Sequence, residues 1–359
     1  MSGFDLRNNY GEVETYSNHI KNGRFLNHMN SLTQHHKANC KPYSRIVDLF
    51  FEPMAEYEKL EDLPYIPVRA FKEIDLFSVD ESKIFKVMRS SGTSGQKPSK
   101  IFIDRETSLN QVHSLSRIMT NFFGFARLPM LIVDSKETIS NRNSFNARAA
   151  GILGFSMFGS HIFYALNSDY SINLEAVMLF NEECKTAQGL VFGFTSIIWR
   201  YLIVPLEMQK TQFQLSGSSL LHGGGWKSML EEGISNEAFK SEIFSTLGIT
   251  NIVNYYGMIE QTGSVFMECQ SGFLHSSVYS NVIIRDHKNF KVLSDGNWGL
   301  IQLQSLLPAS YPGHSILTED IGMIYPGSEC ACGRDGKRIA IRGRVPKAEI
   351  RGCSDTYEP

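Results

Sequence analysis

The sequence has almost no excess of charge of either sign. Its 359 residues include 35 lysines and arginines against 37 aspartates and glutamates, which gives a net charge of −2. So small a charge creates no overall field that would hold a phosphate backbone or an anionic membrane, so nucleic acid is not an expected partner. With 42% hydrophobic residues, the chain can bury a large core, either as one large α/β unit or as two or three domains.

Long uninterrupted apolar runs are also lacking. The opening stretch MSGFDLRNNYGEVETYSNHIKNG is polar and charged and shows no signal peptide, so we expect a cytoplasmic protein. The most apolar stretch, GLVFGFTSIIWRYLIVPL, is interrupted by Arg200 and Pro205, which argues against a membrane span. A buried strand followed by a helix explains it better, with Thr195 or Ser196 capping the helix.

The six cysteines are few, and in a cytoplasmic chain we expect thiols or metal ligands rather than disulfides. Cys40 and Cys184 each stand alone in a helix-like context, so we interpret both as packing residues. Cys353 lies six residues from the carboxyl end, in EIRGCSDTYEP. It could be a packing residue, a metal ligand or a nucleophile on a movable arm.

The other three cysteines gather with one histidine in two short segments, ECQSGFLH and ECACGRDGK. Cys269, Cys330, Cys332 and His275 would supply a tetrahedral set of three thiolates and one imidazole, the kind of site that zinc prefers. Gly333 after the C-x-C pair suits a tight turn. The sequence therefore predicts a structural zinc site, with buried free thiols as the alternative.

The chain shows no internal repeat, low-complexity tract or Pro/Ser-rich linker, which favours one compact body with a short tail. Apolar residues three and four apart predict a helical segment over 1–85. Buried strands at LPMLIVDS, GLVFGF and TNIVNYYG, separated by helical stretches, predict an α/β core over 86–340. That core becomes β-rich from about residue 264, at SVYSNVIIRD, FKVLSDG and WGLIQLQSL, and a hinge and tail occupy 341–359.

A loop rich in hydroxyl groups and glycine joins two β-like segments in VMRSSGTSGQKPSKIFID. Its glycines let the backbone approach an anion closely, and its hydroxyls and lysines supply donors and charge. The spacing is neither that of a Walker A loop nor G-x-S-x-G, and an ordinary Ser/Gly turn is the alternative. The candidate phosphate-binding residues are Ser90, Ser91, Gly92, Thr93, Ser94, Gly95, Lys97 and Lys100.

Further along the chain, NIVNYYGMIEQTG offers Tyr256 as a stacking surface and Glu260 as a carboxylate. A carboxylate beside a phosphate loop usually implies Mg²⁺, although one Tyr and one Glu taken alone are weak evidence. Asp320, in TED, could accept hydrogen bonds from both hydroxyls of a ribose, and GRVPK adds Arg344 and Lys347.

The sequence gives little evidence of a catalytic role for the histidines outside the cysteine cluster. His161 and His314 lie beside aromatic or loop residues, and we expect each to be a structural or surface residue rather than a catalytic one. His161, in FGSHIFYAL, is the one histidine that we single out as a candidate pocket residue.

In their order and spacing, these pieces resemble the adenylate-forming superfamily. SSGTSG is similar to its phosphate loop, NYYGMIE to its Y-G-x-T-E motif with Ile259 in place of threonine, TED to its T-G-D motif, and GRVPK to its hinge. The resemblance implies an adenylate-forming fold that uses ATP and Mg²⁺. It places Ser91, Thr93, Gly95 and Lys100 on phosphate, Gly224 and Tyr256 on adenine, Glu260 on Mg²⁺, and Asp320 and Arg344 on ribose. Gly225 and Gly257 are further candidates for binding the nucleotide.

Over nearly its whole length the chain resembles one branch, the LuxE acyl-protein synthetases, in SSGTSG, LHGGGWK, SLLPASYPGHSILTEDIG and GRVPKAEIRGCSDT. The chain ends fifteen residues after Arg344, so we expect a strongly truncated C-terminal domain. The resemblance implies adenylation of a fatty acid, expected to be long-chain, and transfer to Cys353 as a thioester. A reductase-like protein would then take the acyl group. An acyl-CoA ligase of the phenylacetate-CoA ligase type and a non-catalytic acyl- or nucleotide-binding module are the alternatives.

Overall fold

The computed structural model describes residues 4–10, 13–17, 23–52, 54–90, 97–124, 126–140, 147–224, 226, 229, 232–327 and 329–345. They form two compact units. The first unit combines the described residues up to Phe122 with those from Gly257 onward, whereas the second lies between Phe123 and Tyr256. The boundaries that the sequence suggests near residues 85 and 340 stay predictions.

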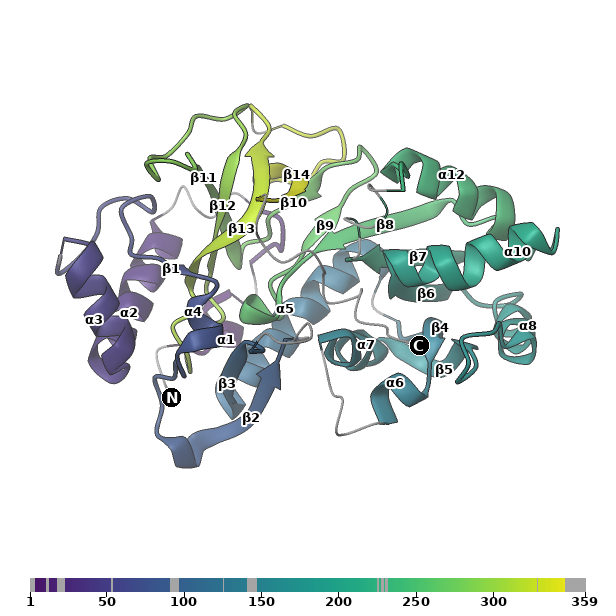
Figure 1. The fold of residues 1–359 in the computed structure, drawn as a ribbon, viewed down its shortest axis with the longest axis horizontal. Coiled ribbons are helices and arrows are strands. Elements are labelled where there is room, and N and C mark those ends of the chain that lie inside the picture. Colours follow the sequence, from purple (N-terminus) through teal and green to yellow (C-terminus); the bar gives the residue numbers. More distant parts are fainter. Residues whose placement is uncertain are drawn as a thin grey trace. The chain divides into compact units, whose positions relative to one another are not determined.

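The second unit is built on a parallel sheet (Figure 1). Its strands are β4 (Leu128–Ser135), β5 (Gly159–Leu166), β6 (Gly189–Phe194), β7 (Ser218–Gly223) and β8 (Asn251–Tyr256). Their order is β8-β7-β6-β4-β5, and each neighbouring pair is parallel. Every residue of β4, β6 and β7 is buried, and β4 and β6 accordingly appear in the sequence as mainly apolar runs. The three strands predicted in this part of the chain are confirmed.

Helices cover both faces of this sheet. They are α6 (Glu137–Ser140), α7 (Ala147–Ser156), α8 (Leu174–Glu183), α9 (Thr195–Ile198), the π-helical turn η4 (Trp199–Ile203), α10 (Val204–Met208) and α12 (Asn236–Leu247). Val191 of β6 packs in one apolar cluster with residues of α8, α10 and α12. The next residue, Phe192, contacts Phe155 of α7, with ring centroids 4.7 Å apart. Successive strand residues face opposite sides, so α7 lies on the other face.

The helix after β6 begins differently from the sequence prediction. The N-cap of α9 is Phe194, which offers no side-chain bond, while Thr195 and Ser196 lie buried inside the helix. The predicted cap is therefore wrong. The Thr195 hydroxyl instead lies 3.0 Å from Nδ1 of His222, and this partner compensates for its burial.

The first unit holds a mostly antiparallel sheet. Its strands are β9 (Phe266–Glu268), β10 (Leu274–His275), β11 (Ser280–Arg285), β12 (Gly299–Ser305), β13 (Ser315–Ile324) and β14 (Arg338–Arg344), in the order β11-β12-β13-β14-β10-β9. The short β1 (Ile66–Pro67) adds a parallel pair on β13. The predicted β-rich section is confirmed except at FKVLSDG, where Val292 makes only an isolated bridge to Arg285. The left-handed Phe290, with φ of 59°, bends the chain there.

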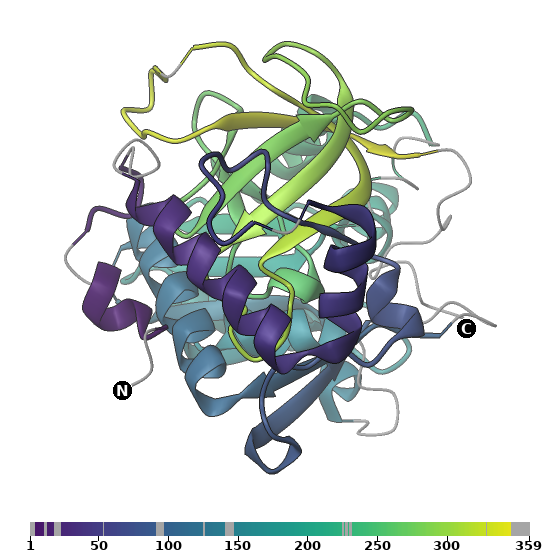
Figure 2. The same ribbon diagram turned by 90° about the vertical axis from the view of Figure 1, so that its left-hand side faces the viewer.

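The first unit also contains helices and short 3-10 turns. They are α1 (Leu6–Tyr10), α2 (Arg24–Asn39), α3 (Lys41–Phe50), α4 (Ala70–Glu73), α5 (Arg105–Phe123) and the 3-10 turns η2 (Glu81–Lys83) and η5 (Ile259–Gln261). Figure 2 shows α2, in purple, in front of the green and yellow strands, where Phe25 and Leu32 join Val278 and Leu306 in one buried cluster. Within the described ranges, no helix is both long and apolar enough to cross a membrane.

Candidate functional site

The predicted phosphate loop connects the strands of a small hairpin in the first unit. The two β-like segments that the sequence predicts beside the loop are strands β2 (Ile84–Arg89) and β3 (Lys100–Asp104), and they pair antiparallel. At its base, the backbone N–H of Ser90 donates to Ser99 O, and the N–H of Ser99 donates to the Ser90 hydroxyl at 2.8 Å. The Ser90 side chain thus helps to close the hairpin. The loop residues Ser91, Gly92, Thr93, Ser94 and Gly95 lie outside the described residues.

Lys100, the basic residue that the sequence assigns to phosphate, begins β3. Its Nζ lies 3.0 and 3.2 Å from the two carboxylate oxygens of Asp75, on the surface of the unit. The side chain is 37% exposed, so a hydrogen-bonded surface ion pair holds it in this structure. To bind phosphate, the Lys100 ammonium group would have to leave the Asp75 carboxylate.

Glu260 lies in η5, immediately after the connection from β8, and is buried. Its backbone carbonyl accepts a hydrogen bond from the Tyr311 hydroxyl at 2.9 Å. Gly313 also packs against it, because a Cβ at residue 313 would come within 2.9 Å of the same carbonyl oxygen. Neighbouring residues therefore fix the backbone that carries the carboxylate.

Burial raises the pKa of Glu260, and the nearby cations Lys72 and Arg344 act against this shift. A buried carboxylate is costly to keep ionised unless a cation compensates for it. The carboxylate is a hard oxygen donor of the kind that Mg²⁺ binds. Glu260 is therefore chemically suited to a divalent cation.

The sheet of the first unit brings Asp320 and Arg344 together, although 24 residues separate them. They face each other in the register of β13 and β14, and Arg344 Nε donates to Asp320 Oδ1 at 3.2 Å. The Thr318 hydroxyl accepts the N–H of Asp320 at 3.1 Å, which fixes the backbone at this point. Both side chains are partly exposed, at 17% for Asp320 and 34% for Arg344, so a ligand could reach them.

Sequence reasoning missed a cation beside these residues. Lys72 lies half-buried on α4, where burial lowers its pKa while the carboxylates Glu319 and Glu260 act in the opposite direction. The pairing of β1 with β13 positions α4, and Phe71 packs against Tyr311 with ring centroids 6.2 Å apart. Only this tertiary pairing brings Lys72 close to Glu260, so no motif or spacing could have identified it.

The residues predicted to surround adenine follow two neighbouring strands of the second unit. Gly224 comes directly after β7, exposed and with a φ of 72°, and Tyr256 ends β8, half-buried. Gly223 and Tyr255 are register partners, and a Cβ on Gly223 would come within 2.5 Å of the Tyr255 carbonyl oxygen. Close strand packing therefore requires a glycine before Gly224. Gly225 lies outside the described residues, and Gly257 already belongs to the first unit.

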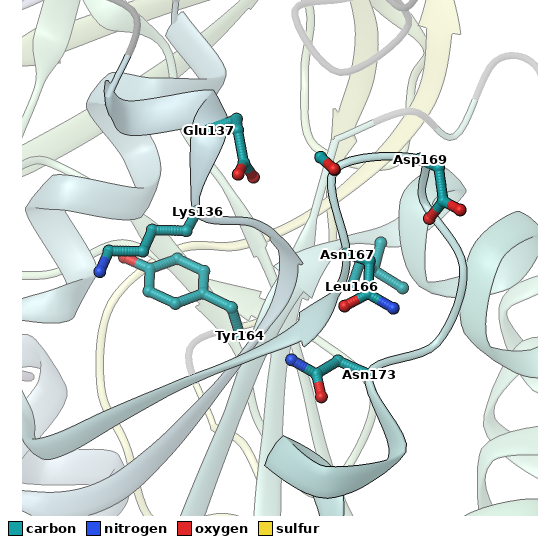
Figure 3. A pocket seen from close by; sticks show the side chains of 8 residues that line it. Lys136, Glu137, Tyr164, Leu166, Asn167, Asp169 and Asn173 are labelled. Carbon is teal, nitrogen blue, oxygen red and sulfur yellow. The ribbon is translucent and has the colours of Figure 1, made fainter.

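A cavity of about 520 Å³ lies at the carboxyl ends of β4 and β5 in the second unit (Figure 3). Lys136 and Tyr164 lie on one side, with Asn167 and Asn173 on the other. This edge of a parallel sheet is where open α/β folds bind ligands. However, the cavity is open to solvent, and its lining residues carry charges of both signs. None of them is a site residue predicted from the sequence, so we assign the cavity no role.

The four residues of the predicted metal set lie together in the first unit. The ligand atoms of Cys269, His275, Cys330 and Cys332 are all within 4.8 Å of one another. Burial acts to raise the pKa of the Cys330 thiol, but hydrogen bonds from the Cys332 backbone and from the other three side chains outweigh it and lower the pKa to about 6. The remaining described cysteines, Cys40 and Cys184, stand apart, as expected of packing residues.

The two histidines considered outside the cluster differ in environment. His161 is a surface residue with a 71% exposed side chain, and its Nδ1 lies 3.1 Å from the Glu183 carboxylate. It does not line the cavity described above, and its exposure agrees with the expectation of a structural or surface residue. A half-buried edge strand explains the apolar neighbours that suggested a pocket. His314 is fully buried, 3.0 Å from the Thr33 hydroxyl, as expected of a structural histidine.

The fold is that of the adenylate-forming enzymes, which confirms the predicted fold class. It matches the crystal structure of an open conformation of 2-hydroxyisobutyryl-CoA ligase with a TM-score of 0.72 at 16% identity, over 93% of this chain and 72% of that chain. The chain belongs to the LuxE acyl-protein synthetase family, a family of ligases whose model matches residues 13–358. The resemblance seen in the motifs is therefore confirmed.

Two curated relatives are similar over most of their length. The long-chain-fatty-acid–luciferin-component ligase of Vibrio harveyi is 23% identical over 306 residues, which cover 83% of this chain and 78% of the relative. The protein of the same name from Aliivibrio fischeri is 23% identical over 283 residues, covering 75% and 73%.

Proposed function

We propose that this protein is an ATP-dependent acyl-protein synthetase. It activates a long-chain fatty acid as an acyl adenylate, transfers the acyl group to the thiol of Cys353, and delivers it to a reductase-like protein. Membership in the LuxE family and the names of the Vibrio and Aliivibrio relatives support the reaction class and the acid. Cys353 lies outside the described residues, so its role rests on the sequence.

The observation that carries the proposal is the group of residues Glu260, Asp320 and Arg344 in the first unit. Asp320 would accept hydrogen bonds from the ribose hydroxyls, and Arg344, already paired with it, would hold that carboxylate in place and contact the nucleotide. Glu260 would bind Mg²⁺, which neutralises charge on the phosphates. Tyr256 and Gly224 stay candidates for adenine from the sequence motifs alone.

The chemistry has two steps. First, a carboxylate oxygen of the fatty acid attacks the α-phosphorus of ATP, the bond to the bridging oxygen breaks, and pyrophosphate leaves. Next, the thiolate of Cys353, its proton lost to solvent, attacks the acyl carbonyl carbon and AMP leaves with the electron pair of the broken C–O bond. An acyl adenylate is a mixed anhydride, so a thiolate attacks it readily, and the thioester stays reactive enough to pass the group on.

Exchange of radioactive pyrophosphate into ATP tests the first step. The purified protein is assayed with a series of carboxylic acids from acetate to palmitate, with and without coenzyme A. We expect exchange that depends on a long-chain acid, and AMP release that coenzyme A does not accelerate. Absence of exchange with every acid would leave only a binding module, while acceleration by coenzyme A would identify an acyl-CoA ligase.

A further inference from the structure

We propose that Cys269, His275, Cys330 and Cys332 hold one structural Zn²⁺ ion. The cluster lies in the first unit and joins two parts of the chain that are far apart in sequence. Cys269 directly follows β9 and His275 is in β10, whereas Cys330 and Cys332 precede β14. This site is independent of the adenylation proposed above.

Two of the distances between the ligand atoms match the edges of a tetrahedral zinc site. With Zn–S bonds of about 2.3 Å and Zn–N bonds of about 2.0–2.1 Å, ideal tetrahedral edges are about 3.8 Å between two sulfurs and about 3.6 Å between sulfur and nitrogen. Sγ of Cys269 and Sγ of Cys330 are 3.8 Å apart. Sγ of Cys332 lies 3.5 Å from Nε2 of His275. The first distance is too long for a disulfide, whose sulfurs are about 2.05 Å apart.

Local backbone structure presents the four ligands from two tight turns. The N–H of Gly272 donates to Cys269 O at 2.9 Å, and the N–H of Cys269 donates to Phe273 O at 2.8 Å. In the second turn, the N–H of Gly333 donates to Cys330 O at 2.9 Å, and Gly333 has a φ of 74°. These backbone hydrogen bonds hold the residues that carry the ligands in defined turns.

Groups around the ligands orient them toward a common centre. Nδ1 of His275 lies 3.4 Å from the carbonyl oxygen of Asp335, which favours the tautomer with the proton on Nδ1 and leaves Nε2 to bind a metal. The N–H of Arg334 points to Sγ of Cys332 at 3.4 Å. Such contacts to the outer side of metal ligands are typical of built metal sites.

The donor set identifies both the metal and its role. Three thiolates and one imidazole are soft to borderline donors, which favour zinc over magnesium or calcium. Four protein ligands complete a tetrahedron and leave no position for water or substrate, so the site is structural rather than catalytic.

The metal would fasten the N-terminal part of the chain to the sheet. Beside the cluster, Arg334 donates to Asn121 Oδ1 at 2.8 Å and lies 4.1 Å from the ring centroid of Phe122, at the end of α5. The N–H of Asp335 donates to Tyr16 O at 3.1 Å, and the Tyr16 ring packs edge-on against His275. Fixing residues 330–335 therefore fixes α5 and residues 13–17 as well.

Elemental analysis and cobalt substitution test the proposal. Protein purified from zinc-supplemented medium should contain one zinc per chain. After exchange with Co²⁺ alone, it should show the thiolate-to-cobalt charge-transfer band and the intense visible bands of tetrahedral Co²⁺. Cobalt absorption that is weak and octahedral, or purified protein that lacks metal yet melts at the same temperature with and without added zinc, would overturn the proposal.

Variants assign the ligands. His275→Ala and Cys332→Ser should lose the metal and melt at lower temperature, whereas His275→Cys should retain it, because a set of four thiolates also binds zinc. Cys184→Ser, which changes a cysteine outside the cluster, should keep one zinc per chain. If the ligand variants do not fold, release of zinc from the wild-type protein by a mercurial thiol reagent gives the same information. Retention of zinc after all thiols have reacted would contradict the assignment.

Discussion

At the scale of single residues, a substitution of Glu260 distinguishes a metal-binding role of its carboxylate from a structural role. We expect Glu260→Gln to fold but to slow acid-dependent pyrophosphate exchange by about a hundredfold, or about 2.7 kcal/mol, because a neutral amide holds Mg²⁺ poorly. The test is exchange at saturating Mg²⁺, with the exposed Glu81→Gln as the control. Exchange at the wild-type rate in Glu260→Gln would remove this carboxylate from the metal site.

Cys353 tests the second step in the same way. Cys353→Ser should keep acid-dependent pyrophosphate exchange, since adenylation does not use the thiol. It should lose the hydroxylamine-labile label that the protein acquires from radioactive fatty acid and ATP, because serine is a weak nucleophile and forms a more inert ester. Cys184→Ser is the matched control and should be labelled normally. Equal labelling of Cys353→Ser and the wild type would show that the acyl acceptor is another residue.

At the scale of elements, helix α4 supplies a cation that acts on Glu260. Removing the positive charge in Lys72→Gln should raise the pKa of Glu260 further, because Lys72 opposes the upward shift that burial causes. Since Mg²⁺ binds the ionised carboxylate, the acidic limb of the pH profile of pyrophosphate exchange should move to higher pH. The exposed Lys83→Gln should leave the profile in place. A lower rate with an unshifted limb would indicate a structural role for Lys72.

The elements also show how far the sequence could predict the structure. Strands β4 and β6 were predictable because full burial makes nearly every residue apolar, and the β2–β3 hairpin because its strands flank an obvious loop. Val292 was misassigned because an apolar residue in a turn resembles one in a short strand. Asp320 and Arg344 were predictable as site residues because they lie in recognisable motifs. Their ion pair was not, because it depends on the register between β13 and β14. Lys72 carried no signal, since only the pairing of β1 with β13 brings α4 to the site.

At the scale of the whole molecule, two buried histidines and a half-buried one predict sensitivity to acid. Burial lowers the pKa of His28 to about 4 and that of His314 to about 3, and it lowers the pKa of His36 well below its ordinary value of 6.5. The unfolded chain therefore binds protons below pH 6.5 that the folded chain excludes. This contribution to stability is complete above pH 6.5 and is lost as the pH falls toward the folded-state values.

The free energy of unfolding should fall by roughly 1.4 kcal/mol per pH unit for each of these histidines below pH 6.5. Urea unfolding at pH 7.5, 6.0 and 5.0 measures the slope. The exposed His161→Gln should show the same loss as the wild type. A free energy of unfolding that stays constant between pH 7.5 and 5.0 would show that these side chains are protonated in the folded protein.

The first unit is made from two separate parts of the chain, and this has a consequence for synthesis on the ribosome. Leu32 of α2 packs with Val278, and roughly 250 residues lie between them. At a translation rate of about 5–20 residues per second, the apolar side of α2 waits about 12–50 s for the strands that will cover it. The stretch from Phe123 to Tyr256, which makes up the described part of the second unit, is synthesised before those strands. The apolar side of α2 is therefore exposed during most of the translation of this protein. We expect ribosome-associated chaperones to bind this surface of the nascent chain.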